Sequence, residues 1–374
     1  MKLLFFITSF AGGGAEKSLL AIAETLAHRG HRVTIAANLS QPAYELPSNV
    51  EYIEKDTYKI KNSGPWYLKY RTIYNRIRLY LVTKNIIKRS APDVIITFLH
   101  TNMREIIQAH GRVPIISSER NTFDRKLYES EYIEKYVLNK KFDRVTVLTN
   151  YDKKFIGDRL DNVVVIPNAL TCQPITLEDY KRSFANKKNI LACGRVSAIG
   201  EDGKLVKGFD LLIKAFSMIA NKHPQYDLDI AGDGTDEGFS FLKNLADKLG
   251  VGERVHFLGF IKDMDGLMKT HSVFVLSSRA EGFGRVVIES MAVGTPVVAF
   301  NCSGPSEIIE DGVDGYLVDK ENVEQLSDRM SSILSNKESR YTFGENALNN
   351  VKRYSMDKII VKWENLFKEV LEKK

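Results

Sequence analysis

The chain has 374 residues, of which 44% are hydrophobic and 27% are charged, and its formal net charge is +6. This length exceeds what one hydrophobic core usually serves, and the composition excludes a disordered or fibrous chain. The three cysteines show no paired spacing, which argues against a disulfide framework and a zinc site and favours a reducing compartment.

The first half of the chain alternates strand-like runs with helical ones. Strands are predicted for residues 3–8, 32–36, 94–98, 115–118 and 145–148, and helices for 16–29, 66–89 and 102–110. The strand-like runs are continuously apolar, which is typical of a parallel sheet with helices on both faces. The apolar start of the chain is short for a signal peptide and leads into a glycine turn and a helix, so we interpret it as a strand. No apolar stretch approaches the roughly 18 to 20 residues that span a bilayer.

The second half repeats this rhythm after a polar run that ends at Lys188. Strands are predicted for 189–193, 227–231, 255–258, 273–276 and 296–300, and helices for 208–221, 238–249, 285–293 and beyond residue 322. We therefore predict an α/β protein with two doubly wound Rossmann-like domains, 1–170 and 171–355, and a C-terminal helix, 356–374, that packs back on the first. Since ligands of such sheets bind at the carboxyl ends of the strands, the active site is expected in a deep cleft between the domains.

The basic residues are concentrated in the first half. Residues 1–170 contain 26 Lys and Arg against 17 Asp and Glu. Between Lys55 and Arg89 the cations alternate with tyrosines and Trp66, and Asp56 is the only acid. An anionic partner is implied there. Nucleic acid would suit the same charges, but no recognition motif accompanies them, so we predict no nucleic-acid binding.

Three glycines, Gly12-Gly13-Gly14, lie between the first strand and the first helix. Backbone N–H groups in such a loop can approach a phosphate at the positive end of a helix. A P-loop would need glycine directly before Lys17, where Glu16 stands, and the dinucleotide fingerprint is also absent. A plain tight turn is the alternative interpretation.

Two cations follow or precede predicted elements of the second domain. Arg195 comes directly after a buried strand, and Lys207 directly before a helix. Cations placed at this edge of a sheet suit a diphosphate leaving group, because they stabilise the charge that develops on it. The alternative is a pair of solvated surface charges.

Two carboxylates flank the segment from Glu281 to Glu289. Gly282-Phe283-Gly284 reads as a loop that enters a helix near Arg285, so its N–H groups can face a sugar or a phosphate. A carboxylate at position 289 can bind the paired hydroxyls of a ribose. The alternatives are a helix-start preference for acids at Glu281 and a helix-surface carboxylate at Glu289.

These motifs together resemble the retaining GT-B glycosyltransferases of glycosyltransferase family 4. The resemblance covers nearly the whole chain and rests on Gly13-Gly14, Gly194-Arg195, Lys207-Gly208, Ala231-Gly232-Asp233-Gly234, Phe257-Leu258-Gly259, the Glu281 and Glu289 pair and Gly312-Val313-Asp314-Gly315. It implies same-face transfer of a sugar from a nucleotide-sugar donor, in which the leaving phosphate oxygen takes the acceptor's proton. It also implies that no metal and no other cofactor is required.

The resemblance implies a role for each matching residue. Arg195 and Lys207 would bind the donor diphosphate, and Gly14, beside Gly13, would lie on the phosphate side. Glu289 would bind the ribose, while Glu281 and the backbone of Phe283 and Gly284 would bind the transferred sugar. The nucleobase would lie against the backbone around Phe260 and Ile261. The carboxylates of Asp263 and Asp265 mimic a DxD metal motif, but they precede a helix, so Asp263 is interpreted as an N-cap.

The chain departs from the family pattern in two places. Many family members carry a histidine near the reacting sugar where this chain has Arg120, and His100 is the nearest substitute. The segment from Arg195 to Lys207 is also longer than usual, with Gly200-Glu201-Asp202-Gly203 inserted.

The stretch 66–89 resembles the acceptor-side helix of family members that extend polyprenyl-diphosphate-linked oligosaccharides. Its apolar residues fall near one helical face with cations around it, which suits anionic headgroups and a lipid diphosphate. A solvated amphipathic core helix is the alternative interpretation.

The sequence therefore predicts a cytoplasmic enzyme that is associated peripherally with the inner membrane face. It would transfer Gal, GalNAc, Glc or GlcNAc from a UDP-sugar to a lipid-linked or polysaccharide glycan. Two rival functions stay open: a sugar phosphorylase or epimerase with the same paired domains, and a non-catalytic sugar- or lipid-binding module.

Overall fold

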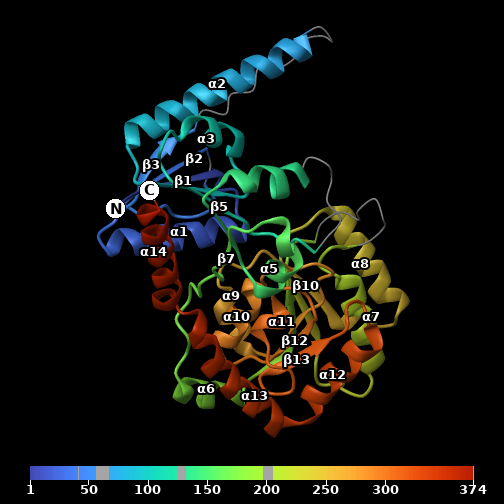
Figure 1. The fold of residues 1–374 in the computed structure, drawn as a ribbon. Helices are drawn as coiled ribbons and strands as arrows, with labels where there is room; N and C mark the ends of the chain where they lie inside the picture. Colours follow the sequence, from blue (N-terminus) through green and yellow to red (C-terminus); the bar gives the residue numbers. More distant parts are fainter. Residues whose placement is uncertain (41, 56–66, 125–131, 197–204, 374) are drawn as a thin grey trace. The chain divides into compact units, whose positions relative to one another are not determined.

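The computed structural model describes residues 1–40, 42–55, 67–124, 132–196 and 205–373. Two compact units make up the chain. The first contains Met1–Ala169 and Met356–Lys374, and the second contains Leu170–Ser355. Each unit is an α/β structure built around one sheet (Figure 1).

The first unit holds a seven-stranded parallel sheet in the order β3-β2-β1-β4-β5-β6-β7. The strands are β1 (Lys2–Ser9), β2 (Arg32–Asn38), β3 (Glu51–Glu54), β4 (Val94–Phe98), β5 (Ile115–Ser118), β6 (Arg144–Val147) and β7 (Val163–Val165). Phe5 of β1 lies opposite Ile35 on one side and Ile96 on the other, and all three are fully buried. Strands β1 to β3 are added toward one edge of the sheet and β4 to β7 toward the other, so the switch point lies between β1 and β4. Rossmann-like sheets bind ligands at this point.

Helices cover both faces of this sheet. They are α1 (Gly14–His28), α2 (Tyr67–Ser90), α3 (Met103–Ala109), α5 (Asn150–Ile156) and α14 (Met356–Glu372), with a π-helical turn η1 (Ile133–Leu138) and a 3-10 turn η2 (Asn139–Lys141). The last helix, α14, lies beside α1 (Figure 1). It buries Trp363, Phe367 and four aliphatic side chains in the same core as β1.

The second unit holds a six-stranded parallel sheet in the order β10-β9-β8-β11-β12-β13, with its switch point between β8 and β11. The strands are β8 (Lys188–Cys193), β9 (Leu228–Ala231), β10 (Val255–Gly259), β11 (His271–Leu276), β12 (Val297–Phe300) and β13 (Gly315–Val318). Its helices are α6 (Leu177–Phe184), α7 (Phe209–Ile219), α8 (Asp236–Lys248), α9 (Met264–Thr270), α10 (Arg285–Ala292), α11 (Pro305–Ile308), α12 (Val323–Ser335) and α13 (Lys337–Asn350).

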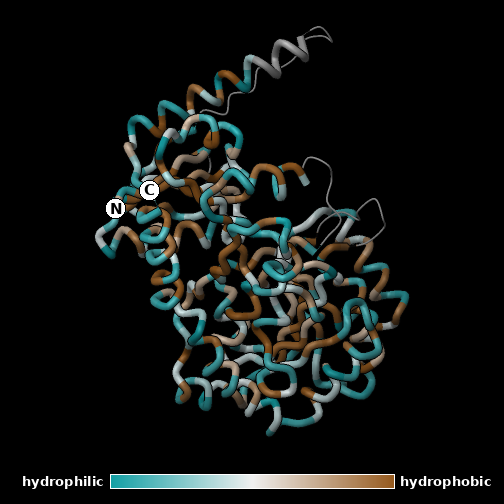
Figure 2. The backbone as a smooth tube through the Cα atoms, viewed as in Figure 1, coloured by the Kyte–Doolittle hydropathy of each residue, from teal (hydrophilic) through white to brown (hydrophobic). Residues whose placement is uncertain are grey.

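The predicted fold class, two parallel-sheet Rossmann-like domains, is confirmed. Hydrophobic residues concentrate in the strands and on the inner sides of the helices (Figure 2).

Two strands, β3 and β13, were not predicted. Both lie at sheet edges and are only partly buried. β3 begins and ends with a glutamate and β13 begins with a glycine, and these residue types are depleted in strands. Within the described ranges, no helix is both long and apolar enough to cross a membrane.

Candidate active site

Lys207 and Glu281 form an ion pair near the switch point of the second sheet. The Lys207 Nζ lies 2.9 Å from the Glu281 Oε2. The two side chains retain only 30% and 18% of their exposure, so the alternative of solvated surface charges is wrong for Lys207. Burial lowers the pKa of Lys207, but the Glu281 carboxylate more than offsets this, and the net pKa is raised. Lys207 is therefore a fixed positive charge at neutral pH.

The backbone around Lys207 is held tightly against the end of β11. The Ser277 hydroxyl donates a hydrogen bond to the Lys207 carbonyl at 3.0 Å. Gly208, the N-cap of α7, has φ +61, and a Cβ there would lie 1.9 Å from the Ser277 carbonyl oxygen. Only glycine fits such a close approach in this conformation. The glycine thus explains how the lysine at the start of α7 is brought to the strand end that precedes Glu281.

The glycine loop before α10 places the second carboxylate. Gly284 is the N-cap of α10 with φ +81. Phe283 before it is buried and makes a T-shaped contact with the Tyr354 ring, with ring centres 5.5 Å apart. Glu289 is 8% exposed, and its Oε1 accepts a hydrogen bond of 2.9 Å from Arg285. The alternative of a solvated helix-surface carboxylate is therefore wrong for Glu289, because this carboxylate is buried and ion-paired.

Three further predicted residues lie at the carboxyl ends of β8 and β10. Arg195 follows β8 and is exposed. Phe260 follows β10 with 71% of its surface exposed, and Ile261 beside it is half-buried.

The predicted insertion Gly200-Glu201-Asp202-Gly203 falls outside the described residues. Asp263 caps α9, as predicted, since its carboxylate accepts a 2.9 Å hydrogen bond from the Gly266 N–H.

No group of three or more His, Cys, Asp or Glu side chains in the described parts of the chain is arranged to hold a metal ion. All three cysteines are free thiols, and burial raises the pKa of Cys193 to about 12. The thiol of Cys193 therefore stays protonated at neutral pH.

The glycine loop of the first unit already faces a carboxylate. The N–H groups of Gly12 and Gly13 both donate to the Glu16 side chain, the first at 2.7 Å. Glu16 lies in the first turn of α1, and its carboxylate caps the N–H of the N-cap residue Gly13, as the acidic residue of a capping box does. The two N–H groups are thus directed at an anionic oxygen, as they would be at a phosphate, although Glu16 must move before a phosphate takes that place.

Arg120 lies inside the core of the first unit. Its guanidinium stacks 4.4 Å above the centre of the Phe98 ring and 5.7 Å from that of Trp363, and Nη1 donates to Asn168 at 3.1 Å. Only 8% of the residue is exposed. These contacts give Arg120 a structural task between β5 and α14.

His100 lies at the carboxyl end of β4 and contacts Glu119, the last residue before Arg120. The His100 Nε2 is 2.6 Å and 2.8 Å from the two carboxylate oxygens of Glu119. Glu119 was missed as a candidate in the sequence. The usable signal was the sheet order, because β4 and β5 are adjacent parallel strands whose ends meet at one edge.

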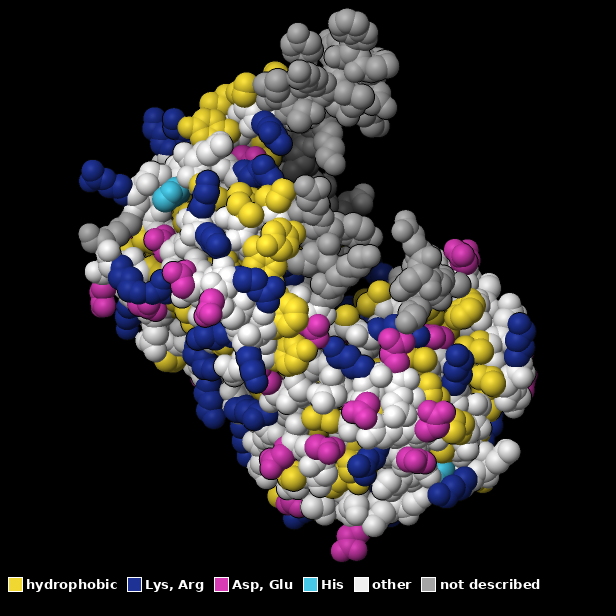
Figure 3. Space-filling model, turned by 45° about the vertical axis from the view of Figure 1, so that its right-hand side comes forward, with side chains coloured by type: hydrophobic (Ala, Val, Ile, Leu, Met, Phe, Trp, Pro, Cys, Tyr) yellow, Lys and Arg dark blue, Asp and Glu magenta, His cyan; other side chains and the backbone are white. Residues whose placement is uncertain are grey.

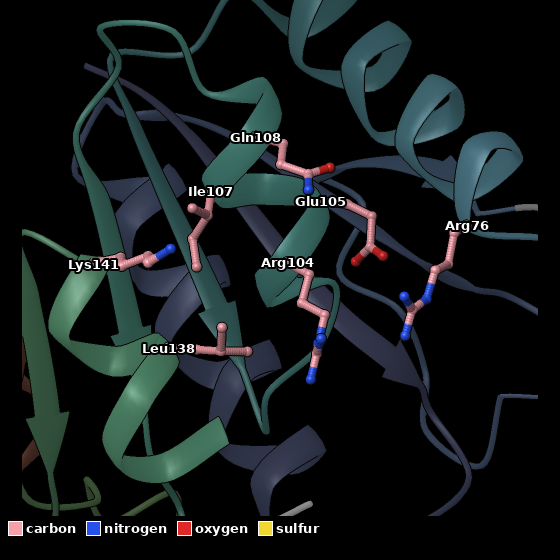
Figure 4. Close-up of a pocket in the computed structure, with 7 residues that line it drawn as sticks. All are labelled: Arg76, Arg104, Glu105, Ile107, Gln108, Leu138 and Lys141. Carbon is pink, nitrogen blue, oxygen red and sulfur yellow. The ribbon is translucent and has the colours of Figure 1, made fainter. Parts of the chain in front are cut away.

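A basic pocket of about 280 Å³ lies under α2 in the first unit. Arg76 reaches into it from α2, Arg104 and Glu105 come from α3, and Lys141 comes from η2 (Figure 4). The visible face of the first unit carries many Lys and Arg side chains interspersed with hydrophobic ones (Figure 3).

The apolar side chains on the middle of α2 are uncovered. Tyr74, Ile77 and Leu81 each expose 55% of their surface, whereas Ile86 and Ile87 near the end of the helix are buried. The alternative of an amphipathic core helix is therefore wrong for the middle of α2. Trp66 falls outside the described residues.

Two family models match the chain in succession. Residues 12–173 match the model described as Glycosyltransferase Family 4, and residues 196–350 match the one described as Glycosyl transferases group 1. An uncharacterized glycosyltransferase of Haemophilus influenzae is 27% identical over 98% of this chain and 99% of that protein.

Two further relatives have informative names. The GalNAc-alpha-(1->4)-GalNAc-alpha-(1->3)-diNAcBac-PP-undecaprenol alpha-1,4-N-acetyl-D-galactosaminyltransferase of Campylobacter jejuni is 25% identical over 99% of both chains. The crystal structure of Anabaena HepE in complex with UDP superposes with a TM-score of 0.76 at 21% identity, over 99% of this chain and 100% of that one.

The paired parallel sheets and this structural match define the GT-B fold of glycosyltransferases. The successive matches to both family models then identify the chain more closely. It is a glycosyltransferase and belongs to the family 4 type.

Proposed function

We propose that this enzyme transfers one hexose or N-acetylhexosamine, namely Gal, GalNAc, Glc or GlcNAc, from a UDP-sugar to a glycan acceptor in bacterial polysaccharide biosynthesis. The observation that carries the proposal is the half-buried ion pair of Lys207 and Glu281 beside the glycine loop of α10. The name of the Campylobacter jejuni relative supports a lipid-diphosphate-linked acceptor, and the UDP bound by the Anabaena protein supports a uridine donor.

The role of Lys207 follows from the charge of the donor. A bound diphosphate offers the Lys207 ammonium stronger acceptors than one carboxylate, so the lysine turns from Glu281 to the phosphates. Arg195 supplies a second cation, and Glu281 is released to accept hydrogen bonds from sugar hydroxyls. The cations stabilise the charge that grows on the leaving phosphate in the transition state.

The remaining predicted residues complete the donor site. Glu289 holds the ribose hydroxyls, the backbone of Gly282, Phe283 and Gly284 faces the sugar, and Arg285 keeps Glu289 in place. Phe260 and Ile261 lie against the nucleobase. Gly13 and Gly14 of the first unit serve the phosphate side.

The proposed reaction is a retaining transfer. The acceptor hydroxyl oxygen bonds to the anomeric carbon while the bond from that carbon to the diphosphate oxygen breaks. The hydroxyl proton passes to the leaving phosphate oxygen, and the products are UDP and the extended glycan. On the acceptor side we assign His100 rather than Arg120, because Arg120 is committed to the core.

The acceptor's lipid end and the membrane surface are assigned to α2. The exposed stripe of Tyr74, Ile77 and Leu81 suits the interface of a bilayer, and the basic pocket suits the phosphates of a lipid or its headgroups. The enzyme would then dock peripherally on the inner membrane face.

The test incubates the purified protein with a panel of UDP-sugars and a lipid-diphosphate sugar acceptor. Transfer with retained anomeric configuration, detected by mass spectrometry and NMR, is expected without added metal. Absence of transfer or hydrolysis with every donor refutes the proposal. Phosphate-dependent release of a sugar 1-phosphate instead would establish the phosphorylase alternative.

The Lys207→Ala variant tests the assigned role of Lys207. We expect kcat to fall by about 10² to 10³ because a preorganised cation at the leaving group is lost. Lys214→Ala, which removes an exposed lysine from the same helix, is the matched control and should keep the wild-type rate. An unchanged rate in Lys207→Ala, in a protein with wild-type circular dichroism, contradicts the role.

A further inference from the structure

The turn after β4 follows an uncommon backbone path. Leu99, His100 and Asn102 have φ angles of +53, +59 and +55, in the left-handed region that residues other than glycine rarely adopt. Such conformations persist only where surrounding contacts fix them, and they cluster at functional sites. Three of them within four residues single out this turn.

Contacts from neighbouring elements hold the turn in place. The Thr101 hydroxyl is 2.9 Å from that of Thr8 on β1, which ties together the two strands of the switch point. The Asn102 side chain donates to Thr83 of α2 at 3.0 Å and accepts from the Lys55 Nζ at 2.9 Å. The strained conformation is therefore maintained by the strand and helix beside it and by a buried lysine.

What the turn presents is the imidazole of His100, clamped by a carboxylate. Glu119 contacts the His100 Nε2 through both of its oxygens and is only 2% exposed. The Asn139 amide donates to the same carboxylate at 2.7 Å, so Glu119 is itself held. On its other side, the His100 Nδ1 lies 3.5 Å from Glu134, which retains 37% exposure.

The surrounding charges decide the protonation of the ring. Among the described residues, the charged groups that face His100 are Glu119, Glu134 and Lys135. The Lys135 ammonium donates to the Thr122 carbonyl at 2.8 Å. Burial lowers the pKa of His100, but the attraction of Glu119 outweighs it, and the net pKa is raised. Burial raises the pKa of Glu119, but His100 outweighs it in turn, and the net pKa is lowered.

We propose that Glu119 is a positioning residue that fixes His100 as a charged hydrogen-bond donor at the switch point of the first sheet. The glycan acceptor then contacts an imidazolium that donates hydrogen bonds and does not act as a base. An imidazolium has no free lone pair, so it cannot take the proton of the acceptor hydroxyl. It can donate through Nδ1 to a hydroxyl or phosphate oxygen that takes the place of Glu134. This inference rests on the proposed function.

The sign of the pH dependence tests the proposal. If the imidazolium is required, kcat/KM falls as the pH rises through the pKa of His100. In Glu119→Gln the fall should move to lower pH by about one unit or more, because the partner charge is gone. The rate at neutral pH should drop about tenfold or more, with the Kd for UDP within about twofold of wild type.

Two outcomes overturn the proposal. If kcat/KM rises with pH through the titration of His100, His100 acts as a base. If kcat/KM falls at the same pH in Glu119→Gln as in wild type, Glu119 has only a structural role. Glu119→Asp, which keeps the charge, should restore part of the high-pH activity. Glu178→Gln, at an exposed carboxylate of α6, is the matched control with wild-type behaviour.

A second measurement does not depend on activity. The chain has seven histidines, and the ring signal of His100 is assigned in NMR spectra by its loss in His100→Gln. Its titration should lie above the ordinary range in wild type and move down in Glu119→Gln. If the wild-type protein transfers no sugar, the proposed function fails, while this titration still decides whether Glu119 sets the charge of His100. A His100 that titrates identically in both proteins refutes the inference.

Discussion

Lys187 is a lysine in the core of the second unit. Lys187 is only 6% exposed. Its Nζ donates to the Thr295 hydroxyl at 2.5 Å and lies 5.9 Å from the centre of the Tyr180 ring. In the part of the chain that the structure describes, no carboxylate lies within ion-pair distance of it. Burial, together with the nearby Lys269 and Arg340, lowers the pKa of Lys187 from 10.5 to about 7.

This shift predicts a pH-dependent gain in stability when the lysine is replaced. The unfolded chain keeps the proton up to pH 10.5, whereas the folded chain releases it above about 7. Stability therefore rises with pH between these values, by about 1.4 kcal/mol per unit at most, and the full cost is present below 7. Lys187→Met should raise the free energy of unfolding most at low pH, with the gain shrinking toward pH 10.5.

Urea unfolding at about pH 6 and about pH 9.5 measures this gain. Lys188→Met, at the exposed neighbouring lysine, is the control and should show no such trend. A gain of equal size at both pH values would mean that Lys187 is charged in the folded protein, against the assigned shift.

The sequence predicts which single residues belong to the candidate site, but not which of them pair with each other. Lys207 and Glu281 each stood out as a charge at a strand or helix end, yet they are 74 positions apart, and nothing local indicates that one neutralises the other. Glu119 is harder still, because an acid after an apolar strand is ordinary in sequence. Glu119 is unusual only because it is buried and paired with His100. This burial depends on η1 and η2, which pack around the pair.

At the scale of the element, α2 carries the strongest prediction. Its exposed Ile77 and Leu81 lie one turn apart on one face, and its cations surround them. Apolar side chains that enter the bilayer interface stabilise the bound state, and each nearby cation adds about 1 kcal/mol on an anionic surface. Ile77→Ser combined with Leu81→Ser should therefore weaken binding to vesicles by about tenfold or more.

Sedimentation with vesicles of phosphatidylcholine and about 30% phosphatidylglycerol measures this binding. Met218→Ser with Leu249→Ser removes two exposed apolar side chains from the second unit and should leave vesicle binding unchanged. Wild-type binding should also weaken as salt is added, since the Debye length shortens. Equal binding of the two double variants would show that α2 is not the docking element.

Most elements were predictable because their physical signals are local. The predicted strands 94–98 and 115–118 coincide with β4 and β5, and the predicted helix 285–293 is α10 to within one residue. The short helices α5 and α6 were not predicted, because each buries only two residues and so shows no apolar period, whereas six of the eight residues of α10 are buried. Their starts are fixed by the Thr149 and Thr176 caps, which are common residues elsewhere.

At the scale of the whole molecule, the first unit is completed by the far end of the chain. Six residues of α14 are buried in its core, although about half of the sequence separates them from β7. The two units are therefore not two simple consecutive segments. The stability of the first should depend on contacts that form only after the second has been synthesised.

Phe367→Ala tests this dependence on one unit at a time. Phe367 is fully buried against Trp363, with ring centres 5.8 Å apart, so its truncation should cost about 3 to 5 kcal/mol. The chain has only two tryptophans, and in a Trp66→Phe background the fluorescence of Trp363 reports on the first unit alone. The fluorescence transition should move to lower denaturant in Phe367→Ala and stay in place in Lys368→Ala, whose side chain is exposed.

The second unit supplies the internal reference for that experiment. Its core is formed by other residues, among them Phe216 and Leu326, so its own unfolding should keep the wild-type midpoint in Phe367→Ala. Backbone amides in this core, such as those of Phe216 and Leu326, should accordingly stay protected from hydrogen exchange at denaturant concentrations where the Trp363 signal has already changed. If this protection and the fluorescence were instead lost together at the lower midpoint, the stability contributed by α14 would extend to both units, and its assignment to the first core alone would be wrong.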